Sequence, residues 1–268
     1  MKLPILRSYA VLYLAFLYIP ILILPIFAFN DSTTAAFPLK GFTTEWFGRV
    51  FSDPALGEAL KNSLIVAGST SVFATLLGIL AARALTRYRF PGSASLSGLI
   101  MLPMVLPEMI MAMALLVVLL SIGVPLSLFT IILGDVLICT PFAVAILTSA
   151  FQSLDKSLEE AAQDLGEGPF STFYLVILPL VMPGIISAML ICFTIAIDEF
   201  IIANFLGSGQ KLLSTYIFGQ LRFPKNVPNI MALGTILVCV SVLLLATAEF
   251  FRRRGLARTG AKDTGGFL

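Results

Sequence analysis

Acidic residues interrupt three of the most apolar stretches of this sequence. Asp198 and Glu199 lie within "CFTIAIDEFIIANF". Glu108 directly follows "MLPMVLP", and Asp135 lies within "IILGDVLIC". An ionised carboxylate at the centre of a bilayer costs about 2.5–3.5 kcal/mol, and such groups usually face a bundle interior or a water-filled path. Because no lysine or arginine occurs within these stretches to neutralise them, the pattern favours a site for a cationic solute.

Structural alternatives for these acids stay open. Each acid can be protonated, hydrogen-bonded between helices or paired with a partner subunit, and this reading is strongest for Asp135. Adjacent residues on a helix point about 100° apart, so Asp198 and the acid that follows it are not expected to serve one site equally. Asp198 is the preferred path-facing residue. Pro103 and Pro107 predict a kinked or partly unwound third span, a feature common at transport sites.

The composition is that of a membrane protein. The chain has 268 residues, of which 58% are hydrophobic and 12% charged, and its mean hydropathy is +1.00; a soluble domain carries about 25% charged residues. The absence of histidine excludes a Ser-His-Asp triad and a His-ligated zinc site. A net charge of +2 offers no basic face for nucleic acid. The three cysteines are dispersed and are interpreted as small buried residues.

The hydropathy pattern predicts an all-α protein that crosses the membrane six times. A bilayer core about 30 Å thick needs roughly 20 apolar helical residues. Windows of that kind are Tyr9–Phe29, Ser63–Leu85, Leu96–Leu120, Leu126–Ala150, Leu180–Phe205 and Ile230–Phe251. The first window is longer than the apolar region of a signal peptide and lacks a small-residue cleavage site, so we expect a retained span. Residues 1–268 are expected to form one transmembrane permease domain.

Charge distribution predicts the orientation. Lysine and arginine are retained on the cytoplasmic side of a membrane, and most of the 17 in this chain fall on the side that carries the two termini. Both termini, including a basic tail at residues 252–268, are therefore expected in the cytoplasm.

The loop at residues 30–62 then lies outside the membrane. Within it, "TTEWFGRVF" has the helical spacing of an interfacial helix. Trp46, the only tryptophan, is either an interfacial anchor or a substrate contact. On the second span, Thr70, Ala74, Gly78 and Ala82 recur one turn apart, which predicts close packing against a neighbouring helix.

A polar connection at residues 151–173 is expected on the cytoplasmic side. Apolar residues recur at intervals of three and four, which is typical of a short amphipathic helix; they are Leu154, Leu158, Ala161, Ala162 and Leu165. Gly166 and the pair Gly168–Pro169 end the helix. A helix with alanines at the centre of its face could enter a groove of another protein. Periodicity alone favours a solvated surface turn.

This connection resembles the signature of permease subunits of ABC importers, E-A-A-x(3)-G-x(9)-I-x-L-P. The matching residues begin with Glu160, Ala161 and Ala162, continue with Gly166, and end at "VILP", with Val176 where isoleucine is usual. The resemblance implies that these four residues form a coupling helix that docks on an ATPase subunit. The chain has no G-x-x-x-x-G-K-[ST] loop. We therefore expect no cofactor in this chain, with ATP and Mg²⁺ bound by separate ATPase subunits.

Much of the chain also resembles the second permease subunit of spermidine/putrescine importers. The stretches that carry this resemblance are "ALKNSLIVA", "MLPMVLPEMIMAMALL", "ICTPFAVAILTSAFQSLD" and "FTIAIDEFIIANFLG". The resemblance implies that Trp46, Glu108, Asp198 and Glu199 lie along a polyamine path, and Asp135 joins them on the argument from burial. Glu108 and Glu199 stand where aspartate is usual, so the preferred cation can differ.

Together these patterns predict a type I ABC importer permease with a MetI-like fold in a bacterial inner membrane. It is expected to be non-catalytic and to work with a second homologous permease, two ATPase subunits and an extracytoplasmic binding protein. One alternative is an importer of an amino acid, an opine or another small organic solute. In that case the acidic residues in the spans have a structural role. A remoter alternative is an ion-coupled carrier or channel that needs no ATP and no coupling helix.

Overall fold

The computed structural model describes the backbone of residues 3–259 and the side chains of residues 6–243. The described backbone is helical, apart from loops and an isolated bridge between Asn30 and Phe42. The chain forms two compact units. The terminal unit contains residues 1–53 and 217–268, and the central unit contains residues 54–216.

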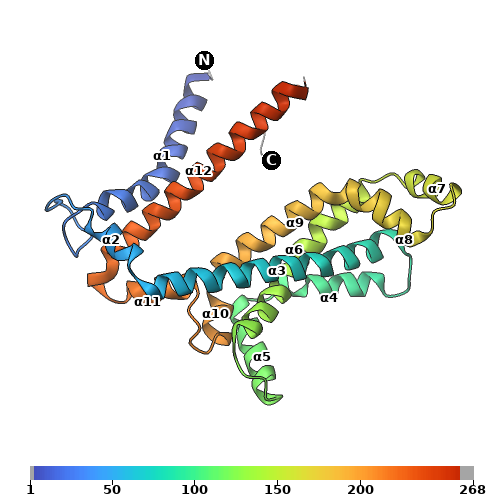
Figure 1. Ribbon diagram of the computed structural model, residues 1–268, viewed down its shortest axis with the longest axis horizontal. Coiled ribbons are helices and arrows are strands. Elements are labelled where there is room, and N and C mark those ends of the chain that lie inside the picture. Colours follow the sequence, from blue (N-terminus) through green and yellow to red (C-terminus); the bar gives the residue numbers. More distant parts are fainter. Residues whose placement is uncertain (1–2, 260–268) are drawn as a thin grey trace. The chain divides into compact units, whose positions relative to one another are not determined.

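The terminal unit is built on two long helices. Helix α1 (Leu3–Ala28) packs against α12 (Val227–Thr259), and the short α2 (Glu45–Phe51) packs against α12 as well (Figure 1). A single 3₁₀ turn, η2 (Pro224–Asn226), leads into α12. The predicted basic tail begins on α12, and residues 260–268 of that tail lie outside the described part.

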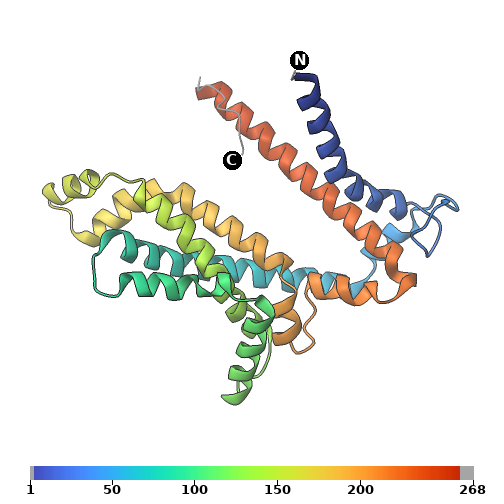
Figure 2. The same ribbon diagram turned by 180° about the vertical axis from the view of Figure 1, so that it is seen from behind.

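The core of the central unit is a bundle of three long helices. These are α3 (Pro54–Arg87), α6 (Leu128–Gln152) and α9 (Leu178–Asp198), which run side by side in both views (Figures 1 and 2). The predicted small-residue stripe of α3 faces this bundle, since Thr70, Ala74 and Ala82 are fully buried. A Cβ added at Gly78 would lie 2.8 Å from the Cβ of Ala143 on α6. The prediction of close helix packing is confirmed.

Two of the cysteines join the same interface. Cys139 of α6 and Cys192 of α9 are fully buried, and each thiol lies 3.6–3.7 Å from the other residue's carbonyl oxygen. Cys239 on α12 is exposed. The interpretation as buried residues is thus correct for the first two cysteines and wrong for the third.

The third predicted span is sharply bent. Helices α4 (Ser93–Val105) and α5 (Glu108–Ser121) meet at an angle of 106°, and Figures 1 and 2 show α5 turned away from the line of α4. The connecting Leu106 is extended, with φ −82° and ψ 141°, as expected for a residue before a proline. The apolar window Leu96–Leu120 is therefore divided between two helices, and the kink predicted from the prolines is confirmed.

The fifth predicted span differs at both ends. It starts as α8 (Pro169–Thr172), continues through a π-helical turn η1 (Phe173–Ile177), and runs as α9 to Asp198. Glu199 is extended, with φ −65° and ψ 121°, and a separate short helix α10 (Ile201–Leu206) follows. The expectation of one helix over Leu180–Phe205 is wrong because the backbone turns at Glu199.

The described helices agree with a multi-pass membrane protein. Five of them are long and apolar enough to span a bilayer, and the bent pair α4–α5 can supply a sixth span. Two further helices complete the central unit. They are α7 (Ser157–Asp164), in the predicted cytoplasmic connection, and α11 (Leu213–Leu221), which continues into the terminal unit.

Candidate functional site: an acid cluster and a basal ion-pair network

Three of the predicted acids approach one another within the central unit. Glu108 is the first residue of α5, Asp135 lies about two turns after the start of α6, and Glu199 occupies the break between α9 and α10. Helix α10 packs against both α5 and α6, which brings the three elements together. The carboxyl groups are near enough that Asp135 is influenced by the charges of the other two. We refer to these three residues as the acid cluster.

Asp135 is the most deeply buried member. Only 1% of the residue is exposed, and neither carboxyl oxygen has a hydrogen-bond partner among the described groups. A buried polar group without a partner is costly. An ionised Asp135 would therefore need a counter-charge or a hydrogen-bond donor beyond the described contacts.

Glu199 has a mixed role. Its side chain is largely buried, and Oε1 accepts a hydrogen bond of 3.0 Å from the backbone N–H of Ile202. Its own carbonyl oxygen accepts a hydrogen bond of 2.8 Å from the Ser214 hydroxyl. These contacts hold the break in place and explain why the helix ends here without a glycine or proline. One carboxyl oxygen of Glu199 is thus used structurally.

Basic residues are absent from the contacts of the acid cluster. Among the described side chains, ion pairs join Arg49 to Glu45 and both Arg83 and Arg87 to Glu159, and none involves a cluster member. The described residues also contain no group of three or more His, Cys, Asp or Glu that could hold a metal ion. The cluster therefore consists of carboxyl groups without a basic neighbour among the described side chains, which could attract an organic cation.

Asp198 directly precedes the break at Glu199. Asp198 ends α9 with an exposed side chain. The expectation that the side chains of Asp198 and Glu199 point about 100° apart assumed a continuous helix. The helix ends at Asp198, so this argument no longer applies. The preference for Asp198 as the path-facing residue stays a prediction.

Trp46 is 5% exposed in the terminal unit. Its Nε1 donates a hydrogen bond of 2.9 Å to the Asn30 carbonyl, and the Arg49 guanidinium lies 4.8 Å from the ring centroid. These contacts make Trp46 an anchor of its own loop.

The predicted coupling helix is present as α7. Glu160 and Ala161 are exposed, Ala162 is buried, and Gly166 ends the segment with φ +91°, a left-handed conformation that favours glycine. Leu158 and Leu165 are exposed by 44% and 87%. The helix therefore presents an apolar surface outward, with an acidic residue beside it.

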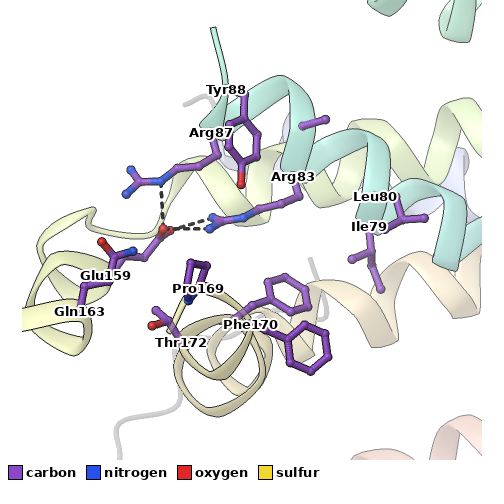
Figure 3. Close-up of a pocket in the computed structure, with 12 residues that line it drawn as sticks. Ile79, Leu80, Arg83, Arg87, Tyr88, Glu159, Gln163, Pro169, Phe170 and Thr172 are labelled. Atoms are coloured by element: carbon purple, nitrogen blue, oxygen red, sulfur yellow. Dashed lines mark hydrogen bonds and ion pairs between the residues drawn. The ribbon is translucent and has the colours of Figure 1, made fainter. Parts of the chain in front are cut away.

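Glu159, which the sequence analysis missed, attaches α7 to α3. Its carboxylate accepts two hydrogen bonds of 2.7 and 2.8 Å from Arg83 and lies 2.9 Å from the Nε of Arg87 (Figure 3). The hydrogen bond from Arg83 lowers the pKa of Glu159, although burial opposes the shift. The sequence feature that could have identified Glu159 is its position three residues before Ala162, which places both residues on one face of the helix.

Comparison with solved structures defines the class of protein. A crystal structure of a bacterial ABC transporter that imports the acidic polysaccharide alginate superposes with a TM-score of 0.73 at 17% identity, covering 92% of this chain and 96% of that one. This similarity shows the fold, which is the MetI-like fold of ABC importer permeases. The expected fold class is confirmed.

Sequence comparison identifies the family. The chain belongs to the family of binding-protein-dependent transport system inner membrane components, whose pattern matches residues 74–257. It is 33% identical to the spermidine/putrescine transport system permease protein PotC of Shigella flexneri, over 94% of this chain and 93% of that protein. It is 35% identical to the putrescine transport system permease protein PotI of Escherichia coli (strain K12), over 96% and 98%. The chain is thus a multi-pass transport permease of the inner membrane, a family that indicates a non-enzymatic role.

Proposed function

We propose that this chain forms half of the translocation path of an ATP-driven importer of polyamines. A second homologous permease forms the other half, an extracytoplasmic binding protein delivers the cargo, and two ATPase subunits bind ATP and Mg²⁺. Both termini and α7 face the cytoplasm, as the distribution of lysine and arginine favours.

The observation that carries the proposal is the acid cluster. Glu108, Asp135 and Glu199 come from three elements of the central unit and have no basic partner among the described residues. Asp135 and Glu199 are buried, whereas Glu108 is exposed. Aliphatic amines resemble the lysine side chain, whose pKa is about 10.4, and are therefore cationic at neutral pH. The fold does not decide the charge of the cargo, since its neighbour imports an acidic polysaccharide. The acids, together with the polyamine permeases among the relatives, support a cationic cargo.

The acid cluster suits transient binding. One carboxyl oxygen of Glu199 already accepts a backbone hydrogen bond, and a path must bind its solute weakly enough to release it. ATP-driven closure of the ATPase subunits would move α7 and expose the path alternately to the two sides of the membrane. Asp198 and Trp46 are proposed as further contacts along this path.

Docking of α7 supplies the link to ATP hydrolysis. Leu158, Ala161 and Leu165 are exposed apolar residues, while Ala162 and Glu159 on the adjacent side of the helix are buried. An exposed apolar helix face flanked by acids fits a groove on another protein. We assign Glu160, Ala161, Ala162 and Gly166 to this docking element.

The proposal is tested by uptake into vesicles that contain the assembled complex and internal ATP. Labelled putrescine and spermidine are compared between the wild type and the variants Glu108→Gln, Asp135→Asn and Glu199→Gln. We expect each neutralisation to lower kcat/KM by about tenfold or more, because loss of one charge-assisted interaction is worth about 1.5–3 kcal/mol. Glu58→Gln, an exposed residue of α3, is the matched control.

Two results would contradict parts of this proposal. Unchanged uptake in all three variants would remove the acid cluster from the mechanism. Preferential competition by amino acids or opines over polyamines would instead assign the importer to another small organic solute and leave the acids a structural role.

A further inference from the structure

A cavity of about 730 Å³ lies where α3, α7, α8 and η1 meet, beside the Glu159 ion pairs (Figure 3). It is separate in sequence and structure from the acid cluster, since it is formed by the end of α3 that carries Arg83 and Arg87. We call it the basal pocket.

The wall that α3 contributes to the basal pocket changes from apolar to basic along the helix. Ile79 and Leu80 come first, Arg83 lies one turn further, and Arg87 and Tyr88 lie two turns further. At 1.5 Å per residue, this stripe is about 12–14 Å long. Phe170 of α8, which is 83% exposed, adds a second apolar wall. The pocket is thus amphipathic along the axis of α3.

The polar part of the basal pocket has an excess of positive charge and hydrogen-bond donors. Two arginines face the single carboxylate of Glu159, which leaves one net positive charge. The Nη atoms of Arg87 point away from Glu159, whose carboxylate lies at Nε (Figure 3). Thr172, which also lines the pocket, is 1% exposed, and its hydroxyl has no partner among the described groups. A donor-rich end with one uncompensated positive charge fits a phosphate group.

We propose that the basal pocket binds an acidic phospholipid. The phosphate lies at the end formed by Arg83, Arg87 and Tyr88, and the acyl chains run along Ile79, Leu80 and Phe170. A basic pocket at the end of a membrane-spanning helix is a suitable site for an anionic headgroup, and the apolar walls would otherwise remain open to the bilayer. The proposal requires only that the chain is a membrane protein and does not depend on the identity of the cargo.

The test uses the assembled complex in nanodiscs of phosphatidylcholine that contain a fixed fraction of phosphatidylglycerol. A tryptophan is introduced by Phe170→Trp, and the fluorescence of the complex without this substitution is subtracted. Either phosphatidylglycerol or phosphatidylcholine is brominated on its acyl chains, so that quenching reports which lipid occupies the pocket. Phe129→Trp, at an exposed site of α6 that does not line the pocket, is the control for ordinary surface lipid.

We expect brominated phosphatidylglycerol to occupy the site about fivefold more often than its mole fraction predicts, the preference that one basic side chain near a lipid surface provides. Arg87→Gln should abolish this preference, whereas Arg89→Gln should not, because Arg89 does not line the pocket. The control position should show no preference. If Phe170→Trp prevents assembly, Leu80→Trp is used instead, because Leu80 also lines the apolar part of the pocket and is exposed.

Two outcomes overturn the proposal. Equal quenching by the two brominated lipids at both positions would mean ordinary bilayer contact. Absence of quenching by either lipid at Phe170→Trp would mean that a protein segment of a partner subunit fills the basal pocket.

Discussion

Glu159 is the residue that most directly joins the proposed docking element to the membrane-spanning bundle. Its neighbour Glu160 belongs to the recognised signature and is exposed, whereas Glu159 is 6% exposed and binds two arginines of α3. The two adjacent acids thus have different roles. Glu160 is available to a partner, and Glu159 fixes the helix that carries it.

Replacement of Glu159 should destabilise this end of the molecule. Glu159→Gln leaves Arg83 and Arg87 partly buried without their carboxylate, and hydrogen bonds to charged groups are worth about 1.5–3 kcal/mol. We expect a lower midpoint of thermal unfolding for the complex in detergent. Asp164→Asn, an exposed residue of the same helix, should leave the midpoint unchanged. A midpoint for Glu159→Gln equal to that of the control would contradict the role of the ion pairs.

The contribution of the Glu159 ion pairs to stability should decrease at low pH. Because the pKa of Glu159 is lowered in the folded protein, its stabilisation is complete above the unfolded pKa of about 4.3. It is lost as the pH falls through the lower folded pKa. The difference in unfolding midpoint between the wild type and Glu159→Gln should therefore be constant near neutral pH and disappear in strong acid. A difference that grew on acidification would be inconsistent with this assignment.

At the scale of the elements, close packing of α3 on α6 depends on Gly78. A Cβ at this position would meet the Cβ of Ala143 at 2.8 Å and the backbone carbonyl carbon of Ala143 at 3.2 Å. The neighbouring backbone cannot move away as a flexible side chain could. Gly78→Ala should therefore cost about 1–3 kcal/mol of stability, as overpacking does.

Gly68 provides the matched control on the same helix. A Cβ there would meet nothing within 4 Å, and replacing a helical glycine with alanine gains about 0.5–1 kcal/mol. Thermal unfolding of the two variants should thus shift in opposite directions. Equal shifts would show that the interface between α3 and α6 tolerates an added methyl group.

The sequence predicted the existence of the elements better than their ends. Apolar windows identified the spans because hydropathy over about 20 residues integrates many side chains. The bend before Glu108 had a local signal in Pro107. The break at Glu199 had none, because it depends on hydrogen bonds to Ile202 and to Ser214, which is 15 residues away.

The candidate site was predictable in part for the same reason. The acids were recognisable individually as charges in apolar segments, and the approach of Glu108, Asp135 and Glu199 depends on how α10 packs against α5 and α6. The Glu159 network joins residues 76 positions apart. The periodicity of apolar residues describes one helix at a time and does not predict contacts between distant segments. Both the acid cluster and the Glu159 network depend on tertiary packing.

At the scale of the whole molecule, transport should require α7 to remain able to dock. Ala161→Glu places a charge on the exposed face without crowding the central unit, because Ala161 is exposed. We expect ATP hydrolysis by the complex to become independent of the loaded binding protein and uptake to be lost. Ala161→Ser, which keeps a small side chain, should retain both. Unimpaired uptake by Ala161→Glu would favour a carrier or channel that works without ATP.

The near-contact of backbones at Gly78 also restricts how the protein can change shape. Where two helices approach this closely, no long side chains lie between them that could change rotamer as the helices move. Sliding of α3 past α6 would therefore cause steric clashes between their backbones. The three central helices should therefore rock together as one rigid body. The hinges for that motion then belong at the bends beside Glu108 and Glu199, where the continuous helical hydrogen-bond pattern is already interrupted.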